Sequence, residues 1–357
     1  MSSRPSPFAK SRLSEFRLIQ TLCRRFGQTS PRVLCGIGDD AAVVRPNTGG
    51  SLLLTTDLLA EGIHFRRDIA TFEDIGYRAA VANLSDIAAM GGTPQYMLVA
   101  LAIPPNCTGA NIERLYKGLM EASRPHGVEL VGGDTSASAQ GLLITITMTG
   151  HADRERVLTR SSARVGDLIY VTGTLGDSLA GLRLLLNDRP AAGVARRDRI
   201  YLLGRHRRPT PRVVEGRTLA RHGLATAAID LSDGLSGDLA HVCEQSGVGA
   251  EIHAAALPLS SACRAYASAQ ALDPIDLALQ GGEDYELLFT VSPRKQARVE
   301  RLARRADCRW SCIGVIRPES FGLRLRHPDG TLRGLRITSY QHFGNQGPSD
   351  REAACSH

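Results

Sequence analysis

Apolar residues recur along the chain with two different periods. Spacings of three and four residues predict helices, whereas alternation and short apolar runs predict strands. The predicted helices are 14–26, 74–90, 111–126, 176–186 and a segment that ends at 246. The predicted strands are 52–55, 96–103, 142–149, 168–172, 227–230 and 287–291. Because strands and helices alternate in both halves, we expect two α/β or α+β domains.

The domain boundary is predicted near Gly150, where the composition of the sequence changes. The stretch "HADRERVLTRSSARVGD" that follows is polar and rich in Arg. We therefore expect an N-terminal domain over 14–150 and a C-terminal domain over 151–343. The polar segments 1–13 and 344–357 are expected to form a flexible leader and a disordered tail.

Composition indicates a soluble globular protein. Of the 357 residues, 43% are hydrophobic and 22% are charged, which is ordinary for that class. No apolar run approaches the roughly 18–20 residues of a membrane span, and the first residues lack the apolar core of a secretory signal. The eight Cys form no C-x-x-C pair. We expect reduced thiols and a cytoplasmic location.

The charge balance favours small anionic ligands at least as much as nucleic acid. The net charge of +7 comes from 43 basic and 36 acidic residues, and only three of the basic residues are Lys. The Arg residues are scattered, and no zinc knuckle or RNP motif accompanies them. Neither a nucleic acid nor a membrane is therefore predicted as a partner.

The stretch "GIGDDAAVV" (Gly36–Val44) fits the loose dinucleotide pattern G-x-G-x-x-G/A. That fingerprint needs a helix directly after the glycines, but Val43-Val44 favours a strand and Pro46 stops a helix early. The dinucleotide interpretation fails on this context. No Walker A, H-R-D or D-F-G motif is present either. "GTLGDS" (Gly173–Ser178) could hold a phosphate on backbone N–H groups or form a plain β–α turn, and both interpretations stay open.

Acidic residues recur where Gly, Ser or Thr accompany the predicted end of an element. A single Asp–Gly turn is common on any surface, but several of these flank strand ends, where α/β proteins build their sites. Brought together, such carboxylates need cations to stay ionised. Mg²⁺ prefers oxygen ligands and keeps substrate phosphates in its shell. The pattern predicts a site for several Mg²⁺ ions and a polyphosphate at Asp39-Asp40, Asp57, Asp86, Asp134, Asp230 with Asp233, and Glu283-Asp284.

The ordered set of motifs resembles the thiamine-monophosphate kinase family over about residues 14–343. The motifs are "GIGDDAAVV", "TTDLLAEGIHF", "NLSDIAAMGGTP", "GGDTS", "LTRSSARVGDLIYVTGTLGDSLAGL", "RPTPRVVEG", "AIDLSDGLSGDL" and "GGEDYELLFTV". The family belongs to the aminoimidazole ribonucleotide synthetase superfamily. The resemblance implies two α/β domains with an ATP cleft between them, and a homodimer joined through the N-terminal sheets.

The resemblance also implies a reaction and its residues. The implied reaction is ATP- and Mg²⁺-dependent phosphorylation of thiamine monophosphate to thiamine diphosphate, with no side chain as acid or base. The implied metal ligands are Asp40, Thr55, Thr56, Asp57, Asp86, Asp134, Asp230 and Asp233. The implied ATP contacts are Gly133, Asp134, Arg160, Ser232 and Tyr116, and the implied substrate contacts are His64, Glu283 and Tyr340. The role of Asp39 stays open, with a place behind the metal ligands as the working hypothesis.

Physical chemistry agrees with this function. The acceptor is a phosphate monoester that is already anionic, so the task is to neutralise charge and align two anions. Two alternatives remain. One is another ATP-using member of the superfamily, although neither Cys23 nor Cys35 lies in the Gly-rich context that selenophosphate synthesis requires. The other is a non-catalytic binder, against which the intact set of Asp residues argues.

Overall fold

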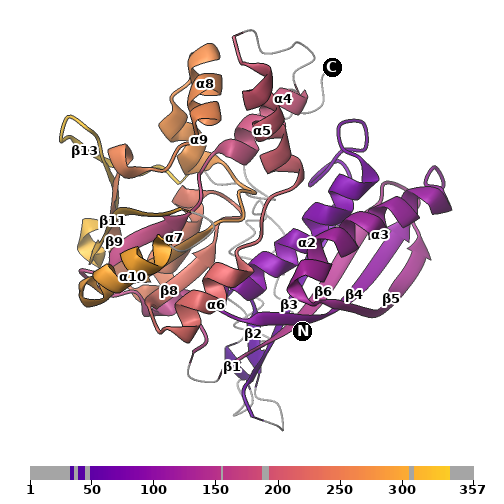
Figure 1. Cartoon of the computed structure of the whole chain (residues 1–357), viewed down its shortest axis with the longest axis horizontal. Helices are drawn as coiled ribbons and strands as arrows, with labels where there is room; N and C mark the ends of the chain where they lie inside the picture. Colours follow the sequence, from indigo (N-terminus) through magenta and orange to yellow (C-terminus); the bar gives the residue numbers. More distant parts are fainter. Residues whose placement is uncertain are drawn as a thin grey trace, which may run out of the picture.

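The chain folds around two β-sheets, each built from a different half of the sequence (Figure 1). A computed structural model describes residues 33–35, 39–44, 49–153, 156–186, 193–304 and 309–337. The helix predicted at 14–26, the first glycines of "GIGDDAAVV", Tyr340, the leader and the tail lie outside these residues.

The first sheet has six strands in the order β1-β2-β3-β6-β4-β5. They are β1 (Val33–Cys35), β2 (Ala42–Val44), β3 (Ser51–Ala60), β4 (Thr93–Ile103), β5 (Glu129–Ala137) and β6 (Leu143–Ala152). All neighbours are antiparallel except β4 and β5, which run parallel. β2 confirms the strand expected at Val43-Val44, so no helix follows the two aspartates, and the dinucleotide interpretation is excluded.

Within the described residues, helices cover one face of this sheet. α2 (Phe72–Ala89) and α3 (Gly109–Ser123), followed by the short η1 (Arg124–His126), lie side by side over it (Figure 1). Strand residues alternate accordingly. Leu53, Met97 and Ile144 are buried beneath the helices, whereas Leu58 and Leu98 point to the other face and are exposed.

The two helices approach closely because glycines lie at their contact. A Cβ added to Gly76 would lie 2.0 Å from the carbonyl oxygen of Leu115, and one added to Gly118 would lie 1.9 Å from that of Glu73. Only glycine fits at these two positions. The close approach fixes α2, and with it the polar residues Arg78, Ser85 and Asp86 that α2 carries.

The second sheet has seven strands in the order β13-β12-β9-β11-β7-β10-β8. They are β7 (Leu168–Thr172), β8 (Ala225–Asp230), β9 (Val248–His253), β10 (Leu287–Val291), β11 (Trp310–Pro318), β12 (Leu323–Arg326) and β13 (Leu332–Gly334). Its helices are α4 (Asp177–Leu186), α5 (Arg196–Arg207), α6 (Val213–Arg221), α7 (Leu235–Ser246), α8 (Ser261–Ala269), α9 (Pro274–Gln280) and α10 (Gln296–Ala303). Single-turn helices are η2 (Arg160–Ser162), η3 (Ala254–Ala256), η4 (Pro293–Lys295) and η5 (Glu319–Phe321).

The two halves share an apolar core at their junction. α2 of the first half packs on α6 of the second, where a Cβ on Gly216 would lie 2.0 Å from the carbonyl oxygen of Ala88. Ala88, Val213 and Phe289 belong to the same cluster of buried residues. The end of α2 is therefore held firmly beside β8, which brings residues of both halves to one site.

The predicted α/β class is confirmed, with corrections to particular elements. α2, β7 and β10 match the predicted segments 74–90, 168–172 and 287–291 closely. β3 continues to Ala60, so Asp57 lies inside the strand and not at its end. "GGDTS" belongs to β5, where a turn was expected. Within the described ranges, no helix has the length and apolar character that crossing a membrane demands.

Candidate active site

Three aspartates from distant parts of the sequence meet at the junction of the two halves. Asp40 precedes β2, Asp86 lies on α2, and Asp230 ends β8. One carboxylate oxygen from each lies within 4.8 Å of the others. Asp40 and Asp230 are buried. Such a concentration of negative charge requires compensation by a cation or a proton.

Neighbouring side chains orient these carboxylates. Ser85 Oγ donates to Asp230 Oδ2 at 2.7 Å, and Thr55 Oγ1 donates to Asp86 Oδ2. Arg160 binds Asp40 with two parallel bonds, from Nε to Oδ2 at 2.9 Å and from Nη2 to Oδ1 at 2.6 Å. This fork brings a positive charge into direct contact with the cluster.

Asp57 faces the same cluster from the sheet. Its side chain points to the helix-covered side of β3, and its buried Oδ2 has no hydrogen-bond partner among the described residues. Burial, and then the charge of Asp40, raise the pKa of Asp57 to about 6. An orphaned carboxylate oxygen beside three other carboxylates fits a site for hard divalent cations.

The pKa values of the other acids report the same crowding. Burial, and then repulsion from Asp57, raise the pKa of Asp86 well above its usual range. Burial, and then repulsion from Asp40, also raise the pKa of Asp230 well above its usual range. The same two causes raise the pKa of Asp39 to about 6. Without a cation, folding therefore favours protonated carboxyl groups here.

Asp39 lies behind this cluster and supports Arg160. Its Oδ2 accepts the backbone N–H of Arg160 at 3.2 Å, and its Oδ1 accepts that of Asp40 at 3.0 Å. These bonds tie the loop before β2 to the start of the second half. They fit the hypothesis that Asp39 positions other residues.

Two predicted ligands, Thr56 and Asp134, lie on the opposite face of the sheet. Thr56 follows the inward-facing Thr55, and because side chains alternate along a strand, that of Thr56 points outward. Its Oγ1 donates to the carbonyl oxygen of Ile146 at 3.0 Å. Asp57, Ile146, Val99 and Gly133 form one row across β3, β6, β4 and β5. Three strand spacings, about 14 Å in all, separate the ends of that row.

The place of Asp134 follows from this row. Asp134 comes one residue after Gly133 on the exposed edge strand β5, so its side chain faces outward, away from Asp57. Gly133 itself has φ +154°, and a Cβ there would lie 1.8 Å from Val99 O. Within one chain, the structure does not bring Asp134 to the acidic cluster.

The predicted substrate residues His64 and Glu283 do meet, around Arg78 of α2. Arg78 Nη2 donates to Glu283 Oε1 and to the carbonyl oxygen of His64, the latter at 3.4 Å. Burial acts to raise the pKa of Glu283, but the charge of Arg78 prevails and lowers it. His206 Nδ1 lies 3.7 Å from Glu283 Oε2. A carboxylate is thus presented at the junction of the halves, 30% exposed at its side chain.

The remaining predicted nucleotide contacts are dispersed. Ser232 and Asp233 form the turn after β8, and Ser232 O accepts the backbone N–H of Glu283 at 2.7 Å. Tyr116 lies on α3 and packs against the first core. Arg160 lies at the acidic cluster, as described above.

Sequence reasoning missed Arg78, His206 and Ser85. Arg78 stands within the apolar run "IGYRAAVANLSDIAA" of α2, and Ser85 and Asp86 follow two turns later. A charged residue on the buried face of an amphipathic helix is a usable signal, because such residues are rarely buried without a partner. His206 carries no such local signal, since its neighbours in α5 are mostly polar.

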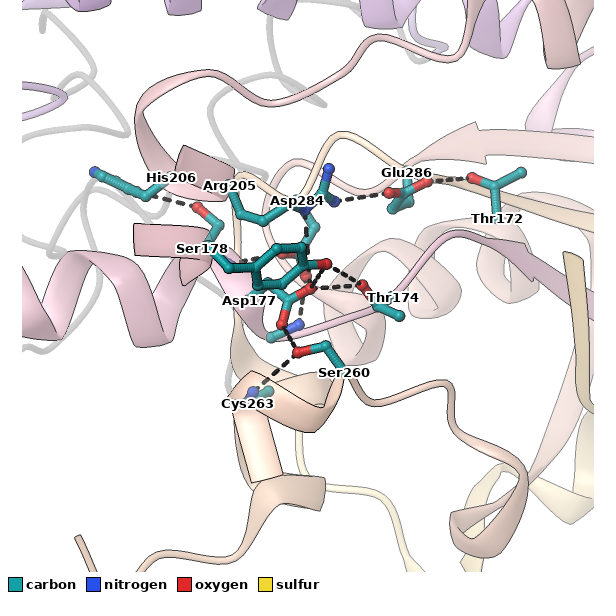
Figure 2. Close-up of polar contacts among 12 residues, drawn as sticks. Thr172, Thr174, Asp177, Ser178, Arg205, His206, Ser260, Cys263, Asp284 and Glu286 are labelled. Carbon is teal, nitrogen blue, oxygen red and sulfur yellow. Dashed lines mark hydrogen bonds and ion pairs between the residues drawn. The ribbon is translucent and has the colours of Figure 1, made fainter. Parts of the chain in front are cut away.

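The phosphate-cradle interpretation of "GTLGDS" is excluded by the chain itself. At the start of α4, the N–H groups of Gly176 and Ser178 donate to the Asp284 carboxylate at 2.6 and 3.0 Å (Figure 2). Asp284 is 1% exposed. An internal carboxylate therefore takes the place at the helix N-terminus that a phosphate would need.

Comparisons with known proteins agree with this arrangement. The models for AIR synthase related protein match the chain at residues 38–152 (N-terminal domain) and 164–325 (C-terminal domain). Thiamine-monophosphate kinase of Haemophilus influenzae is 40% identical over 85% of the chain and 89% of its own length. That of Escherichia coli K12 is 38% identical, over 92% of the chain and 98% of its own length.

Solved structures extend the likeness to three dimensions. AaThiL complexed with AMPPCP and TMP has a TM-score of 0.81 and 35% identity, over 94% of this chain and 100% of its own. Thiamine-monophosphate kinase from Stenotrophomonas maltophilia has a TM-score of 0.71 and 36% identity, over 91% and 98%. The hydrogenase maturation protein HypE in complex with ATP is 22% identical and shares the fold alone. With both AIR synthase related domains and such relatives along nearly its whole length, the chain belongs to the thiamine-monophosphate kinase family.

Proposed function

We propose that the protein transfers the γ-phosphoryl group of ATP to thiamine monophosphate, giving thiamine diphosphate and ADP. The observation that carries the proposal is the meeting of Asp40, Asp86 and Asp230 beside an Asp57 oxygen that no described residue bonds. The relatives named above are kinases of this substrate, and the solved neighbour was complexed with AMPPCP and TMP. The reaction is placed in the cytoplasm, where ATP is available.

The donor set fits Mg²⁺ ions. Asp40, Asp86 and Asp230 converge, and Asp57, whose pKa responds to the charge of Asp40, adds a buried oxygen that has no hydrogen-bond partner in the described part of the chain. Oxygen-rich sites of this kind suit Mg²⁺. Asp40, Asp57, Asp86 and Asp230 would hold the ions, with Thr55 adjoining and Asp233 in the next turn. Bound Mg²⁺ supplies positive charge that lets two phosphate groups approach each other.

The chain's own residues position the reactants and provide no proton transfer. An oxygen of the acceptor phosphate attacks the γ-phosphorus in line, and the bond to the β–γ bridging oxygen breaks. Because that acceptor oxygen is already deprotonated, no general base is required. Arg160, whose guanidinium now donates to Asp40, would donate to ATP instead, together with Ser232 and Tyr116.

The thiamine moiety is assigned to the group around Glu283. Glu283 is held ionised by Arg78, and an ionised carboxylate suits a cationic ligand carrying N–H donors. His64 lies at the same place, because Arg78 contacts its carbonyl oxygen. Tyr340 completes the predicted set from outside the described residues.

The exposed face of the first sheet is assigned to a homodimer. Large apolar side chains exposed by between 37% and 55% gather there: Leu58, Tyr96, Leu98 and Leu143. A contiguous apolar face of this kind usually marks an interface. Thr56 and Asp134 lie on it, so a ligand role for Asp134 is assigned to the partner's site.

The test of the function is direct assay of the product. Purified protein is incubated with ATP, Mg²⁺ and thiamine monophosphate, and thiamine diphosphate is quantified by chromatography, with unphosphorylated thiamine as a second acceptor. We expect thiamine diphosphate from the monophosphate only. Turnover of a different acceptor without this product would favour another activity of the superfamily, and tight binding without turnover would favour a binding protein.

A further inference from the structure

The loop "GGEDYE" (Gly281–Glu286) has an unusual backbone beside the proposed substrate site. Glu283 has φ +61° and Tyr285 has φ +50°. Residues other than glycine rarely adopt this left-handed conformation, and two within three residues persist only where the surroundings enforce it. Something in the structure must therefore hold this loop.

Successive side chains of the loop serve two different sides. Glu283 points to Arg78 and the first half of the chain. Tyr285 is buried near Glu283, Asp57 and Asp230, whose charges act on its hydroxyl. Asp284 and Glu286 instead enter the interior of the second half. The loop therefore presents Glu283 and Tyr285 to the site, while Asp284 and Glu286 hold the loop in place.

The first fixed point is Asp284. As described above, its carboxylate accepts the backbone N–H groups of Gly176 and Ser178 at the start of the ten-residue α4 (Figure 2). Ser178 Oγ also lies 3.1 Å from His206 Nδ1, and His206 borders Glu283. The same helix start thus supports the backbone of the loop and one neighbour of its functional carboxylate.

The second fixed point is Glu286, whose side chain is fully buried. Arg212 binds it with two bonds, Nε to Oε2 and Nη2 to Oε1, both at 2.6 Å. Arg205 Nη2 donates at 2.7 Å and Thr172 Oγ1 at 2.6 Å (Figure 2). A Cβ on Gly173 would lie 2.1 Å from Oε1, so only glycine leaves room for this carboxylate. The Glu286 carboxylate is ionised and both of its oxygens are hydrogen-bonded, so its position is fixed.

Main-chain bonds connect the loop to the turn after β8. Glu283 N donates to Ser232 O at 2.7 Å, Tyr285 N to Leu231 O at 3.0 Å, and Leu231 N to Glu286 O at 2.8 Å. That turn directly follows Asp230. The position of Glu283 is consequently set relative to the acidic cluster by the loop's own bonds.

We propose that Asp284 and Glu286 are positioning residues that hold Glu283 in its strained, substrate-facing conformation. The proposal rests on the function proposed above, in which Glu283 contacts thiamine monophosphate. It assigns a role to "RPTPR", because Arg212 ends that motif. It also predicts that loss of either fixed point acts on the substrate through Glu283.

A double-mutant cycle tests this. In Asp284→Asn, one of the two oxygens that accept N–H groups at the start of α4 becomes an NH2 group, which cannot accept. We expect the KM for thiamine monophosphate to rise about tenfold, as misplacement of a binding group does. In a Glu283→Gln background the same substitution should change that KM less than about twofold, because coupled residues are not additive. Glu286→Gln should behave in the same way.

The matched control is Glu251→Gln. Glu251 is also a buried carboxylate of the second sheet held by two arginines, Arg317 at 2.8 Å and Arg326. It should lower the Tm but leave the KM unchanged. If Glu286→Gln does not fold, Asp284→Asn alone decides the question. Additive effects, or an unchanged KM in active Asp284→Asn protein, overturn the inference. A wild type that makes no thiamine diphosphate overturns the proposed function instead.

Discussion

At the scale of single residues, the site is defined by carboxyl groups whose surroundings oppose their ionisation. Asp57, Asp86 and Asp230 lie near one another, and each has a pKa raised by burial and then by a neighbouring acid. Arg160 supplies one positive charge nearby. The fold therefore holds these carboxyl groups where their ionised forms are unfavourable, and perturbed pKa values of this kind are typical of functional sites.

Asp57 gives a pH-dependent prediction. Its folded pKa of about 6 lies above its ordinary 3.8, so its favourable contribution is complete below about pH 3.8 and is lost as the pH rises through about 6. In EDTA, Asp57→Asn should therefore have a higher Tm than wild type at pH 7.5, by about 2 °C or more, and a smaller advantage at pH 5. Differential scanning calorimetry at both pH values measures this. A pH-independent difference would contradict the assigned burial of charge.

The same substitution has the opposite effect on catalysis. Removing one charge from the proposed cation site should lower kcat about a hundredfold or more, as loss of a preorganised charge does in other enzymes. Far-UV circular dichroism should match the wild type, since Asp57 Oδ2 makes no hydrogen bond among the described residues. Wild-type turnover by Asp57→Asn would remove this residue from the site.

At the scale of elements, the crossing of α2 and α3 holds Arg78 and Asp86 in place. Gly118→Ala would put a Cβ 1.9 Å from Glu73 O, and we expect a loss of about 1–3 kcal/mol in the free energy of unfolding, typical of overpacking. Gly109→Ala in the same helix meets nothing within 4 Å and should be neutral or slightly stabilising. Urea denaturation of both variants compares them, and equal stabilities would contradict the packing described.

Long periodic segments could be predicted from the sequence, whereas the direction of side chains and the pairing of strands could not. α2 carries both an apolar period and a Gly-Gly stop, so its limits were found within two residues. α5, "RRDRIYLLGRHR", was missed because its charged residues hide the period. The strand β5 was missed because "GGDTS" has the composition of a turn and pairs only through a distant strand.

The site shows the same division. The local motifs predicted the acids, and the structure brings Asp40, Asp57, Asp86 and Asp230 together. Sequence alone could not show that β3 continues past Asp57, so the outward direction of Thr56 was not foreseen. His206 and Arg78 reach Glu283 only because α5 and α2 pack at the junction, which no local pattern records.

At the scale of the whole molecule, the proposed dimer predicts complementation between inactive variants. If Asp134 serves the partner's site, a mixture of Asp134→Asn and Asp86→Asn chains forms heterodimers with one intact site of two. Random reassembly should then restore about one quarter of wild-type activity.

The control mixes Asp57→Asn with Asp86→Asn. Both changes affect the site of their own chain, so every site stays defective and no activity should return. Recovery in this control, or full activity of Asp134→Asn alone, would contradict the assignment of Asp134 to the partner. Light scattering tests the proposed dimer independently.

The most direct test of the central claim is the cation dependence of thiamine diphosphate formation. Protein freed of metal with EDTA is titrated with Mg²⁺ at saturating ATP and thiamine monophosphate, with Asp86→Asn measured alongside. We predict no turnover without Mg²⁺, full recovery for the wild type, and a kcat at least about a hundredfold lower for the variant at every Mg²⁺ concentration. Turnover in the absence of any divalent cation, or wild-type turnover by Asp86→Asn, would contradict the account.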